Sequence, residues 1–334
     1  MRVLVTGGAG YIGSHVVRQL GEAGHQVVVY DNLSTGHDWA VLDGELVVGD
    51  LSDTERLEAV FASHRFDAVM HFAAHIVVPE SVREPLRYYA NNTGNVLGLL
   101  ELVERYGVPR FVFSSTAAVY GMPATELVDE QAPLAPINPY GASKMMSERL
   151  LRDLAAASSL RYVILRYFNV AGADPMARIG QATPEATHLI KVACEAALGK
   201  RESVSVFGSD YATRDGTGVR DYIHVEDLAR AHLAALEYLG DGGPSEVLNC
   251  GYGHGYSVRE VLAAVQRVAG TGLEIREAER RPGDPATLVA DSRRIREVLR
   301  WSPEWDDLET IVRHALAWEA RLAGQRQGRL VGGV

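Results

Sequence analysis

Short apolar, β-branched runs alternate with longer helical patterns through the first half of the chain, and this alternation constrains the fold more than any other feature. None of the runs alternates cleanly between apolar and polar residues, which is typical of strands buried on both faces. The runs lie at residues 3–6, 26–30, 45–48, 68–72 and 110–114. Because helical stretches such as 12–23 and 53–64 separate them, the sequence predicts βαβ units and a doubly wound parallel sheet of the α/β class.

Charge and cysteine content exclude several classes of protein. The 334 residues include 33 basic and 43 acidic side chains, for a net charge of −10, whereas nucleic-acid-binding modules are usually basic. The two cysteines, Cys194 and Cys250, match neither a disulfide framework nor a metal-binding spacing. No apolar run approaches the roughly 18 residues needed to span a bilayer. We therefore expect a cytoplasmic protein without a metal site, a nucleic-acid partner or a membrane span.

A glycine-rich turn follows the first apolar run, with the spacing G-x-x-G-x-x-G from Gly7 through Gly10 to Gly13. Gly7 permits a tight turn, Gly10 lets a pyrophosphate approach the backbone, and Gly13 lets the next helix pack closely on the strand. The phosphates would then bind N–H groups at the start of that helix, near Tyr11 and Ile12. A plain strand–helix turn can use the same glycines, but the apolar runs on both sides favour a dinucleotide site.

Acidic residues follow the second and third runs. Asp31, followed by Asn32, stands where a carboxylate accepts hydrogen bonds from the adenosine ribose and repels a 2′-phosphate, which favours NAD over NADP. Asp50 and Leu51 follow the third run. They are predicted either to border the adenine or simply to cap a helix.

Tyr140 and Lys144 are spaced i and i+4 in a helix predicted to begin at Pro139, with Asn138 as its N-cap. A tyrosine with its ordinary pKa near 10 is a poor base, but a neighbouring ammonium and a positive nicotinamide ring favour the phenolate. Lysine is also scarce, since the only others among the 33 basic residues are Lys191 and Lys200. An exposed tyrosine beside a solvated lysine is the alternative; the scarcity of lysine and the glycine turn favour a catalytic pair.

Thr116 closes a predicted strand at its carboxyl end, where open parallel sheets bind their ligands. Its hydroxyl is placed to hydrogen-bond the substrate oxygen whose proton Tyr140 removes. A hydroxyl at a strand end can also do no more than cap the following segment.

Together these motifs resemble the extended short-chain dehydrogenase/reductase family, and in particular its UDP-hexose 4-epimerases. The resemblance spans residue 1 to about residue 320, and its most specific stretch is Gly216–Val225. It implies tightly held NAD, a homodimer, and reversible inversion at C4 between UDP-glucose and UDP-galactose. The reaction would pass through a transient 4-ketosugar, with Tyr140 as the general base.

The resemblance also implies roles for residues that the spacing alone does not identify. In the NAD site these are Phe72, Ala73, Asn91, Ser114 and Tyr167, beside Tyr140 and Lys144. In the UDP-sugar site they are Asn169, His188, Leu189, Phe207, Arg220, Arg281 and Asp284, beside Thr116 and Tyr140. The two arginines suit the task, because guanidinium groups match the geometry of a diphosphate.

The chain departs from the family pattern at several positions. Ile76 stands where many members place a lysine that contacts the cofactor, so one polar contact is expected to be missing. His188 replaces a frequent asparagine and Lys191 a frequent proline. Leu288 is intermediate between the bulky tyrosine and the small residue that family members carry there, a position that limits room for an N-acetyl group. We expect a preference for UDP-glucose and UDP-galactose over N-acetylated sugars, with UDP-pentoses left open.

Two domains and a tail are predicted from these patterns. A Rossmann-type NAD-binding domain is expected from residues 1–169 plus 222–250. A smaller, discontinuous α/β substrate lobe is expected from residues 170–221 plus 251–322, and a flexible tail from residues 323–334.

Sister activities compete with this interpretation. Nucleotide-sugar 4,6-dehydratases follow the catalytic threonine with two acidic residues, but Ala117 and Ala118 follow Thr116 here, which argues against dehydration. Epimerases of UDP-pentoses and epimerases or decarboxylases of UDP-glucuronate remain as alternatives. A non-catalytic NAD-sensing protein is a further alternative, but such proteins tend to lose the Tyr/Lys pair.

Overall fold

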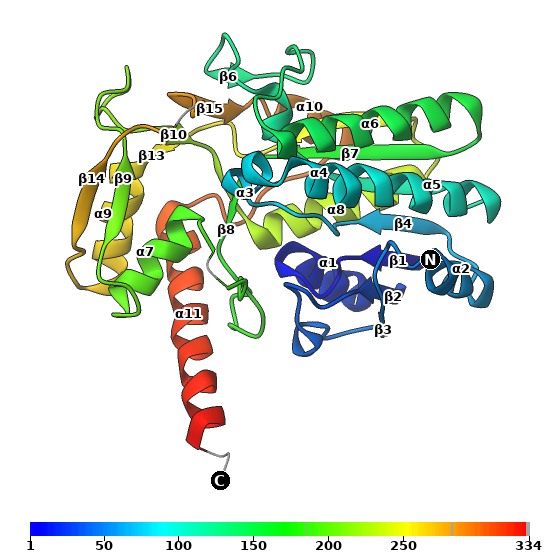
Figure 1. The fold of residues 1–334 in the computed structure, drawn as a ribbon, viewed down its shortest axis with the longest axis horizontal. Coiled ribbons are helices and arrows are strands. Elements are labelled where there is room, and N and C mark those ends of the chain that lie inside the picture. Colours follow the sequence, from blue (N-terminus) through cyan, green and yellow to red (C-terminus); the bar gives the residue numbers. More distant parts are fainter. Residues whose placement is uncertain (185, 282, 332–334) are drawn as a thin grey trace.

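A seven-stranded parallel sheet forms the centre of the protein, in the order β12-β7-β5-β4-β1-β2-β3 (Figure 1). The computed structural model describes residues 1–184, 186–281 and 283–331. The strands of the sheet are β1 (Arg2–Thr6), β2 (Gln26–Asp31), β3 (Glu45–Val48), β4 (Ala68–His71), β5 (Arg110–Thr116), β7 (Arg161–Tyr167) and β12 (Glu246–Cys250). The predicted doubly wound α/β fold is confirmed.

Helices cover both faces of this sheet, because successive side chains of its strands point to opposite sides. Val3 and Val5 of β1 belong to the core cluster beneath α1 (Tyr11–Glu22) and α8 (Val225–Gly240). Leu4 belongs to the cluster on the other face. That face is covered by α2 (Thr54–Ser63), α5 (Asn95–Arg105) and α6 (Pro139–Ala157), and the short helices α3 (Val78–Arg83) and α4 (Pro85–Tyr89) precede α5.

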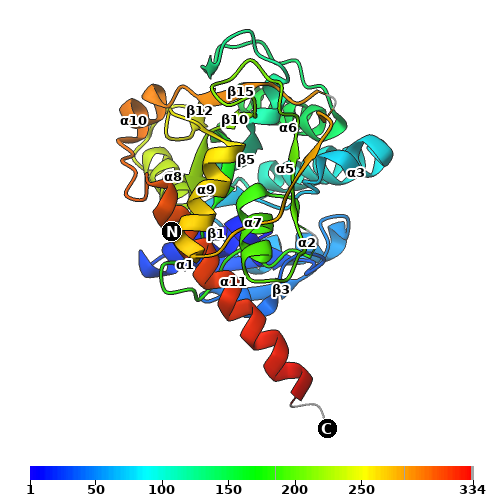
Figure 2. The same ribbon diagram turned by 90° about the vertical axis from the view of Figure 1, so that its left-hand side faces the viewer.

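Three small sheets and four helices make up a second lobe, which occupies the left and the top of Figure 1 and whose left-hand part faces the viewer in Figure 2. One sheet has the order β13-β10-β15-β6, and the strand pairs β11-β8 and β14-β9 form the others. The strands are β6 (Leu127–Val128), β8 (Asn169–Ala171), β9 (Val204–Phe207), β10 (Val219–Arg220), β11 (Tyr222–His224), β13 (Tyr256–Ser257), β14 (Ile275–Ala278) and β15 (Thr287–Ala290). The helices are α7 (Leu189–Ala197), α9 (Val258–Ala269), α10 (Arg293–Leu299) and α11 (Leu308–Val331).

Two segments differ from the sequence-based expectation. β6 lies inside the range predicted for the NAD-binding domain, yet it pairs with β15 of the second lobe, because the chain leaves the main sheet at Gly121 with φ +68°. The predicted flexible tail begins inside α11, which is helical as far as Val331. The Ala, Leu, Arg and Gln residues there are good helix formers and outweigh isolated glycines. Residues 332–334 of that tail lie outside the described residues.

No helix in the described ranges combines the length and the apolar character needed to cross a bilayer.

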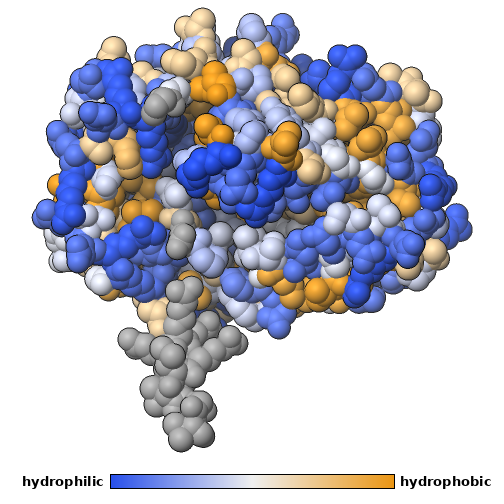
Figure 3. Space-filling model, viewed as in Figure 1, coloured by the Kyte–Doolittle hydropathy of each residue, from blue (hydrophilic) through white to orange (hydrophobic). Residues whose placement is uncertain are grey.

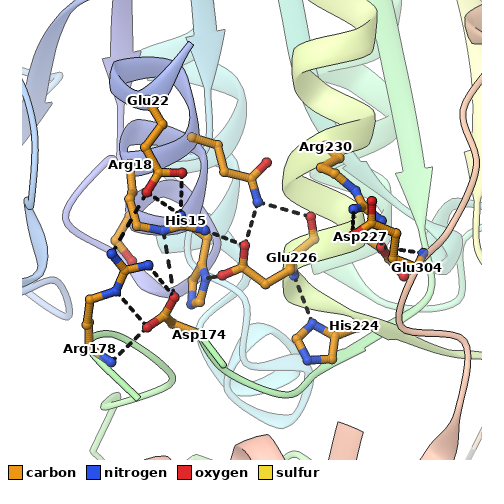
Figure 4. A network of polar contacts seen from close by, with 12 residues as sticks. His15, Arg18, Glu22, Asp174, Arg178, His224, Glu226, Asp227, Arg230 and Glu304 are labelled. Atoms are coloured by element: carbon orange, nitrogen blue, oxygen red, sulfur yellow. Dashed lines mark hydrogen bonds and ion pairs between the residues drawn. The ribbon is translucent and has the colours of Figure 1, made fainter. Parts of the chain in front are cut away.

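A buried polar network joins α1 to α8 and to the segment after β8 (Figure 4). The carboxylate of Glu226 accepts a hydrogen bond from His15 Nδ1 at 2.6 Å and pairs with the guanidinium of Arg18. Arg18 also lies 4.0 Å from Asp174, whose carboxylate binds Arg178 in a bidentate manner. Helix α1 is therefore fastened both to the main domain and to a segment of the second lobe.

Glu226→Gln is expected to lower the free energy of unfolding at pH 7 by about 3 kcal/mol, because it removes the buried carboxylate that binds Arg18 and His15 and leaves Arg18 only the half-exposed Glu22 and, at 4.0 Å, Asp174. Glu22→Gln is the matched control: Glu22 binds the same arginine, but its side chain is 54% exposed, so the loss should stay below about 0.5 kcal/mol. Denaturant unfolding of both variants checks this. Equal losses would contradict it.

The contribution of Glu226 to the free energy of unfolding should also depend on pH. Burial alone would raise the pKa of Glu226, but contacts with His15, Arg18 and Gln19 outweigh it and hold that pKa below the ordinary value. A carboxyl whose pKa is lowered in the folded state contributes stability above its unfolded pKa and loses it as the pH falls. The difference between wild type and Glu226→Gln should therefore shrink in acid.

Candidate active site

The glycine turn forms a cradle at the carboxyl edge of the sheet. Gly7 has φ +75°, and a Cβ atom there would lie 2.4 Å from the backbone nitrogen of Ala73. A Cβ atom at Gly13 would lie 2.2 Å from the Gly7 carbonyl oxygen, so α1 can approach β1 this closely only with glycine. A Cβ atom at Gly10, the N-cap of α1, would have the Gly7 carbonyl oxygen as its nearest neighbour, at 3.3 Å. The backbone at this helix start is thus open to a ligand, which fits a pyrophosphate.

Asp31 is held beside this cradle at the end of β2. Its two carboxylate oxygens accept the N–H groups of Ala9 and Leu33 at 2.9 and 2.8 Å. Burial raises the pKa of Asp31, and the two backbone hydrogen bonds oppose that rise. Each carboxylate oxygen keeps a lone pair for a further donor, which fits the ribose hydroxyls of a dinucleotide.

The other residues predicted around the adenosine divide into two groups. The Asn32 amide donates to Asp50 Oδ2 at 2.7 Å, and this bond and those from Ser52 lower the pKa of Asp50. These polar groups lie at the ends of β2 and β3. The side chain of Leu51, in contrast, packs in the core on the α2 and α5 face, and its predicted place beside the adenine stays a prediction.

The segment after β4 lies against the cradle and is anchored by a residue that the predicted site omitted. The N–H groups of Phe72 and Ala73 both donate to the Thr6 carbonyl, at 2.8 and 3.1 Å. The Asn92 side chain donates to the His75 carbonyl at 2.9 Å and to Ser143 Oγ of α6 at 3.1 Å. Asn92 thus joins the β4 loop to the helix of the catalytic pair; its only signal in the sequence was adjacency to the predicted Asn91.

Asn91 itself lies in a π-helical turn, Ala90–Gly94, between α4 and α5. Its amide donates to Asn92 Oδ1 at 2.9 Å. Ile76, which replaces the polar residue of many family members, is 46% exposed.

Helix α6 brings the predicted catalytic pair to the ends of β5 and β7. Asn138 caps its first turn by accepting the Gly141 N–H at 2.9 Å, and this starts the helix so that Tyr140 and Lys144 lie on its buried face. Lys144 Nζ donates to the Ser114 carbonyl at 2.9 Å. The Ser114 hydroxyl in turn hydrogen-bonds the phenol of Tyr167 on β7.

Thr116 caps the segment after β5, which is one of the two roles that its position suggested, and its contact with the substrate oxygen stays a prediction. Its hydroxyl accepts the Ala118 N–H at 3.1 Å and so caps the short turn after β5. It also hydrogen-bonds Tyr140, which lowers the pKa of that phenol and partly offsets its burial.

Burial dominates the electrostatics of the pair. It raises the pKa of Tyr140, and it lowers the pKa of Lys144 to about 7. Burial therefore opposes the ionised form of each group, and it leaves Lys144 about half protonated near pH 7. Because a nearby positive charge stabilises a phenolate, a cationic nicotinamide beside Tyr140 would lower the pKa of its phenol and increase the fraction present as phenolate, the form that accepts a proton.

A second group of predicted residues lies in the second lobe, on two of its sheets and the segment between β14 and β15. Arg220 of β10 pairs with Asp284 at 2.5 Å, and the guanidinium carbon of Arg281 lies 3.9 Å from the ring centre of Phe207 on β9. Leu288 is the neighbour of Arg220 across the β10–β15 ladder. It packs on the apolar cluster that contains Ala117 and Phe168, beside the Thr116 turn. Arg220 and the specificity position therefore share one sheet, and Arg281 precedes its strand β15 in the chain.

The remaining predicted substrate residues line a small pocket at the start of α1, near α7 and α11. Asn169, His188 and Leu189 belong to its wall, and so does Tyr11, whose phenol donates to the Gly172 carbonyl at 2.7 Å. Burial lowers the pKa of His188, and Lys191 lowers it further. The phenol of Tyr11 thus binds the segment after β8, and the predicted contact of the cofactor with the N–H groups at this helix start stays a prediction.

The two lysines outside the catalytic pair have a shared structural partner. Lys191 Nζ lies 2.5 Å from Glu319 on α11, and Lys200 Nζ lies 2.6 Å from the same carboxylate. Lys191 lies on α7 and Lys200 lies just after it, so both contacts hold α11 against this part of the second lobe.

Comparison with known proteins places this site in a family. Residues 3–251 match the sequence profile of the NAD dependent epimerase/dehydratase family, and the chain belongs to that family. It is 59% identical over 322 residues to UDP-glucose 4-epimerase of Azospirillum brasilense, which covers 96% of this chain and 92% of that protein. The predicted family, fold and NAD dependence are confirmed.

Two solved structures are close neighbours. The UDP-glucose 4-epimerase from Brucella ovis, in complex with NAD, has a TM-score of 0.92 and 44% identity, covering 95% of this chain and 97% of that one. The UDP-Glc/GlcNAc 4-epimerase from Campylobacter jejuni has a TM-score of 0.85 and 50% identity, covering 96% of this chain and 99% of that one.

Alanine at Gly13 and at Gly10 should have separable effects. Gly13→Ala places a Cβ atom against backbone and is expected to destabilise the fold by about 2 kcal/mol or more and to abolish NAD retention. Gly10→Ala meets no backbone closer than 3.3 Å, so the thermal midpoint should stay within a few degrees while NAD affinity falls. Thermal unfolding and NAD content of the purified proteins distinguish the two. An unaltered NAD content in Gly10→Ala would contradict the proposed pyrophosphate contact.

Proposed function

We propose that this chain catalyses the reversible C4 epimerisation of UDP-glucose and UDP-galactose with tightly held NAD. The observation that carries the proposal is the buried group Tyr140, Lys144 and Thr116, which lies at the same sheet edge as the glycine cradle. Its 59% identity to a UDP-glucose 4-epimerase supports the same substrate pair.

NAD would accept the hydride from C4 of the sugar and return it to the opposite face. Tyr140 takes the proton of the 4-hydroxyl as the hydride leaves, which gives a 4-ketosugar, and returns it in the second half of the reaction. Thr116 hydrogen-bonds the same oxygen and keeps it within reach of the phenol. Lys144 favours the phenolate by its charge and holds the nicotinamide ribose. Because proton and hydride both return, no net oxidation occurs.

Arg220 and Arg281 would bind the diphosphate, with Asp284 and Phe207 orienting the two guanidinium groups. Asn169, His188 and Leu189 would contact the substrate from the pocket beside Tyr11. Anchoring the nucleotide at a distance from C4 allows the ketosugar to turn while it stays bound.

UDP-galactose incubated with the purified protein, without added NAD, should be converted to UDP-glucose. A panel of UDP-sugars should show kcat/KM for the N-acetylated pair about tenfold or more below that for UDP-glucose, because Leu288 limits the room beside the sugar. Comparable values would contradict the assigned role of Leu288. Exclusive turnover of UDP-pentoses or UDP-glucuronate would replace the proposed substrate by one of the sister activities.

Substitutions in the catalytic pair should lower kcat while NAD stays bound. Tyr140→Phe removes the proton acceptor and is expected to cost at least about 100-fold in kcat. Lys144→Arg keeps a charge but replaces a compact ammonium by a longer planar group, and should cost at least about tenfold. Full turnover by Tyr140→Phe would rule out the mechanism.

We also infer a cytoplasmic homodimer, with residues 83–105 and the start of α6 in the interface. Large apolar side chains are exposed on α3, α4, α5 and α6, including Val82, Leu86, Leu97 and Met146, and Leu86 is 80% exposed. The face shown in Figure 3, over which these helices run, carries several apolar groups between hydrophilic ones. Sedimentation equilibrium should give twice the chain mass, and Leu86→Glu should shift it toward the monomer.

A further inference from the structure

A buried carboxylate lies one helical turn beyond Lys144. Glu148 of α6 is 1% exposed, and its oxygens accept hydrogen bonds from three donors on two strands. Ser115 Oγ of β5 donates at 2.6 Å, and Arg166 of β7 donates from Nε at 2.9 Å and from Nη2 at 2.5 Å. One carboxylate thus fastens helix α6 to the ends of two neighbouring strands.

These elements carry the catalytic groups. Ser115 stands between Ser114, whose carbonyl binds Lys144 Nζ, and Thr116, which hydrogen-bonds Tyr140. A displacement of α6 along β5 would therefore change the Lys144 and Tyr140 contacts together.

The same network extends to the second lobe. Arg166 Nη1 donates to the Tyr120 phenol at 3.0 Å, which donates to Asn249 Oδ1 at 2.6 Å. The Asn249 amide donates to the Val128 carbonyl of β6 at 2.8 Å. Since β6 pairs with β15, Glu148 is linked to the strand that carries Leu288.

Glu148 also has an electrostatic effect on Lys144. Burial lowers the pKa of Lys144, and the charge of Glu148 opposes that change. His71 faces the lysine from β4, but burial lowers the pKa of His71 to about 3, so it is neutral. Two cations lie near Glu148: Arg166 of β7 is its ion-pair partner, and Arg152 of α6 lies 3.8 Å from its Oε2.

We propose that Glu148 is a positioning residue of the epimerisation, which fixes Lys144 against β5 and supplies the negative charge that keeps this lysine an ammonium ion. The inference rests on the proposed function, because it assigns Glu148 a role in the state of the catalytic lysine. The network also links the catalytic helix to the specificity strand.

The scarcity of lysine makes a direct test possible. Holoenzyme labelled with ¹³C at lysine Cε should give only three lysine signals, and Lys191→Arg and Lys200→Arg assign them by loss. In Glu148→Gln the titration midpoint of Lys144 should lie at least about 0.5 pH unit below the wild-type midpoint. The alkaline limb of the kcat profile should move in the same direction, because the ammonium is lost at lower pH.

Two further variants complete the design. Ser115→Ala removes one hydrogen bond to Glu148 but keeps its charge, so the Lys144 midpoint should stay within about 0.2 pH unit of wild type. Glu148→Gln leaves Arg166 buried without its carboxylate partner. If it does not fold, Glu148→Gln is combined with Arg166→Gln and compared with Arg166→Gln alone, so that only the carboxylate differs, and the midpoint should be lower in the double variant.

An unchanged Lys144 midpoint in the Gln variants, or an equal change in Ser115→Ala, would overturn the proposal. The proposed function fails by a different result. In that case the wild-type protein would not interconvert UDP-galactose and UDP-glucose, whatever the Lys144 titration shows.

Discussion

The close contact between helix α1 and strand β1 is the constraint on which the rest of the structure depends. With hydrogen alone at the Gly13 α-carbon, the first turn of α1 packs onto the Gly7 carbonyl, and its free N–H groups are directed to the edge where the strands end. Phe72, Ala73 and Asp31 are arranged around that helix start by hydrogen bonds to Thr6, Ala9 and Leu33. Any side chain at Gly13 would displace all of them.

Burial and charge oppose each other at the catalytic pair. Burial disfavours the charged form of each group, the phenolate of Tyr140 and the ammonium of Lys144, so placement in the core alone does not produce the catalytic state of either. The groups that shift this balance are polar neighbours: Thr116 for Tyr140, and Glu148 for Lys144. Because the site is buried and contains few charges, an added positive charge would strongly lower the pKa of the Tyr140 phenol.

Local patterns predicted the main sheet, the glycine cradle and the Tyr140 helix, because each depends on residues close together in sequence. The resemblance to a family was needed for Arg220 and Arg281, since nothing in their neighbourhood distinguishes them from 28 other arginines. Glu148 and Asn92 were not among the predicted site residues, because their partners lie on other elements, 17 to 51 residues away. The pairing of β6 with β15 was missed for the same reason: a two-residue strand has no periodicity of its own.

The ion pair between Arg220 and Asp284 has a consequence for how the site handles its anionic substrate. The guanidinium already has a carboxylate partner, so in the proposed role of Arg220 a diphosphate would compete with Asp284 for it. Part of the attraction would then be offset by releasing Asp284, which would limit how tightly either nucleotide sugar is held. In the proposed reversible reaction, whose substrate and product carry the same diphosphate, this weaker binding would favour release of the product and further turnover.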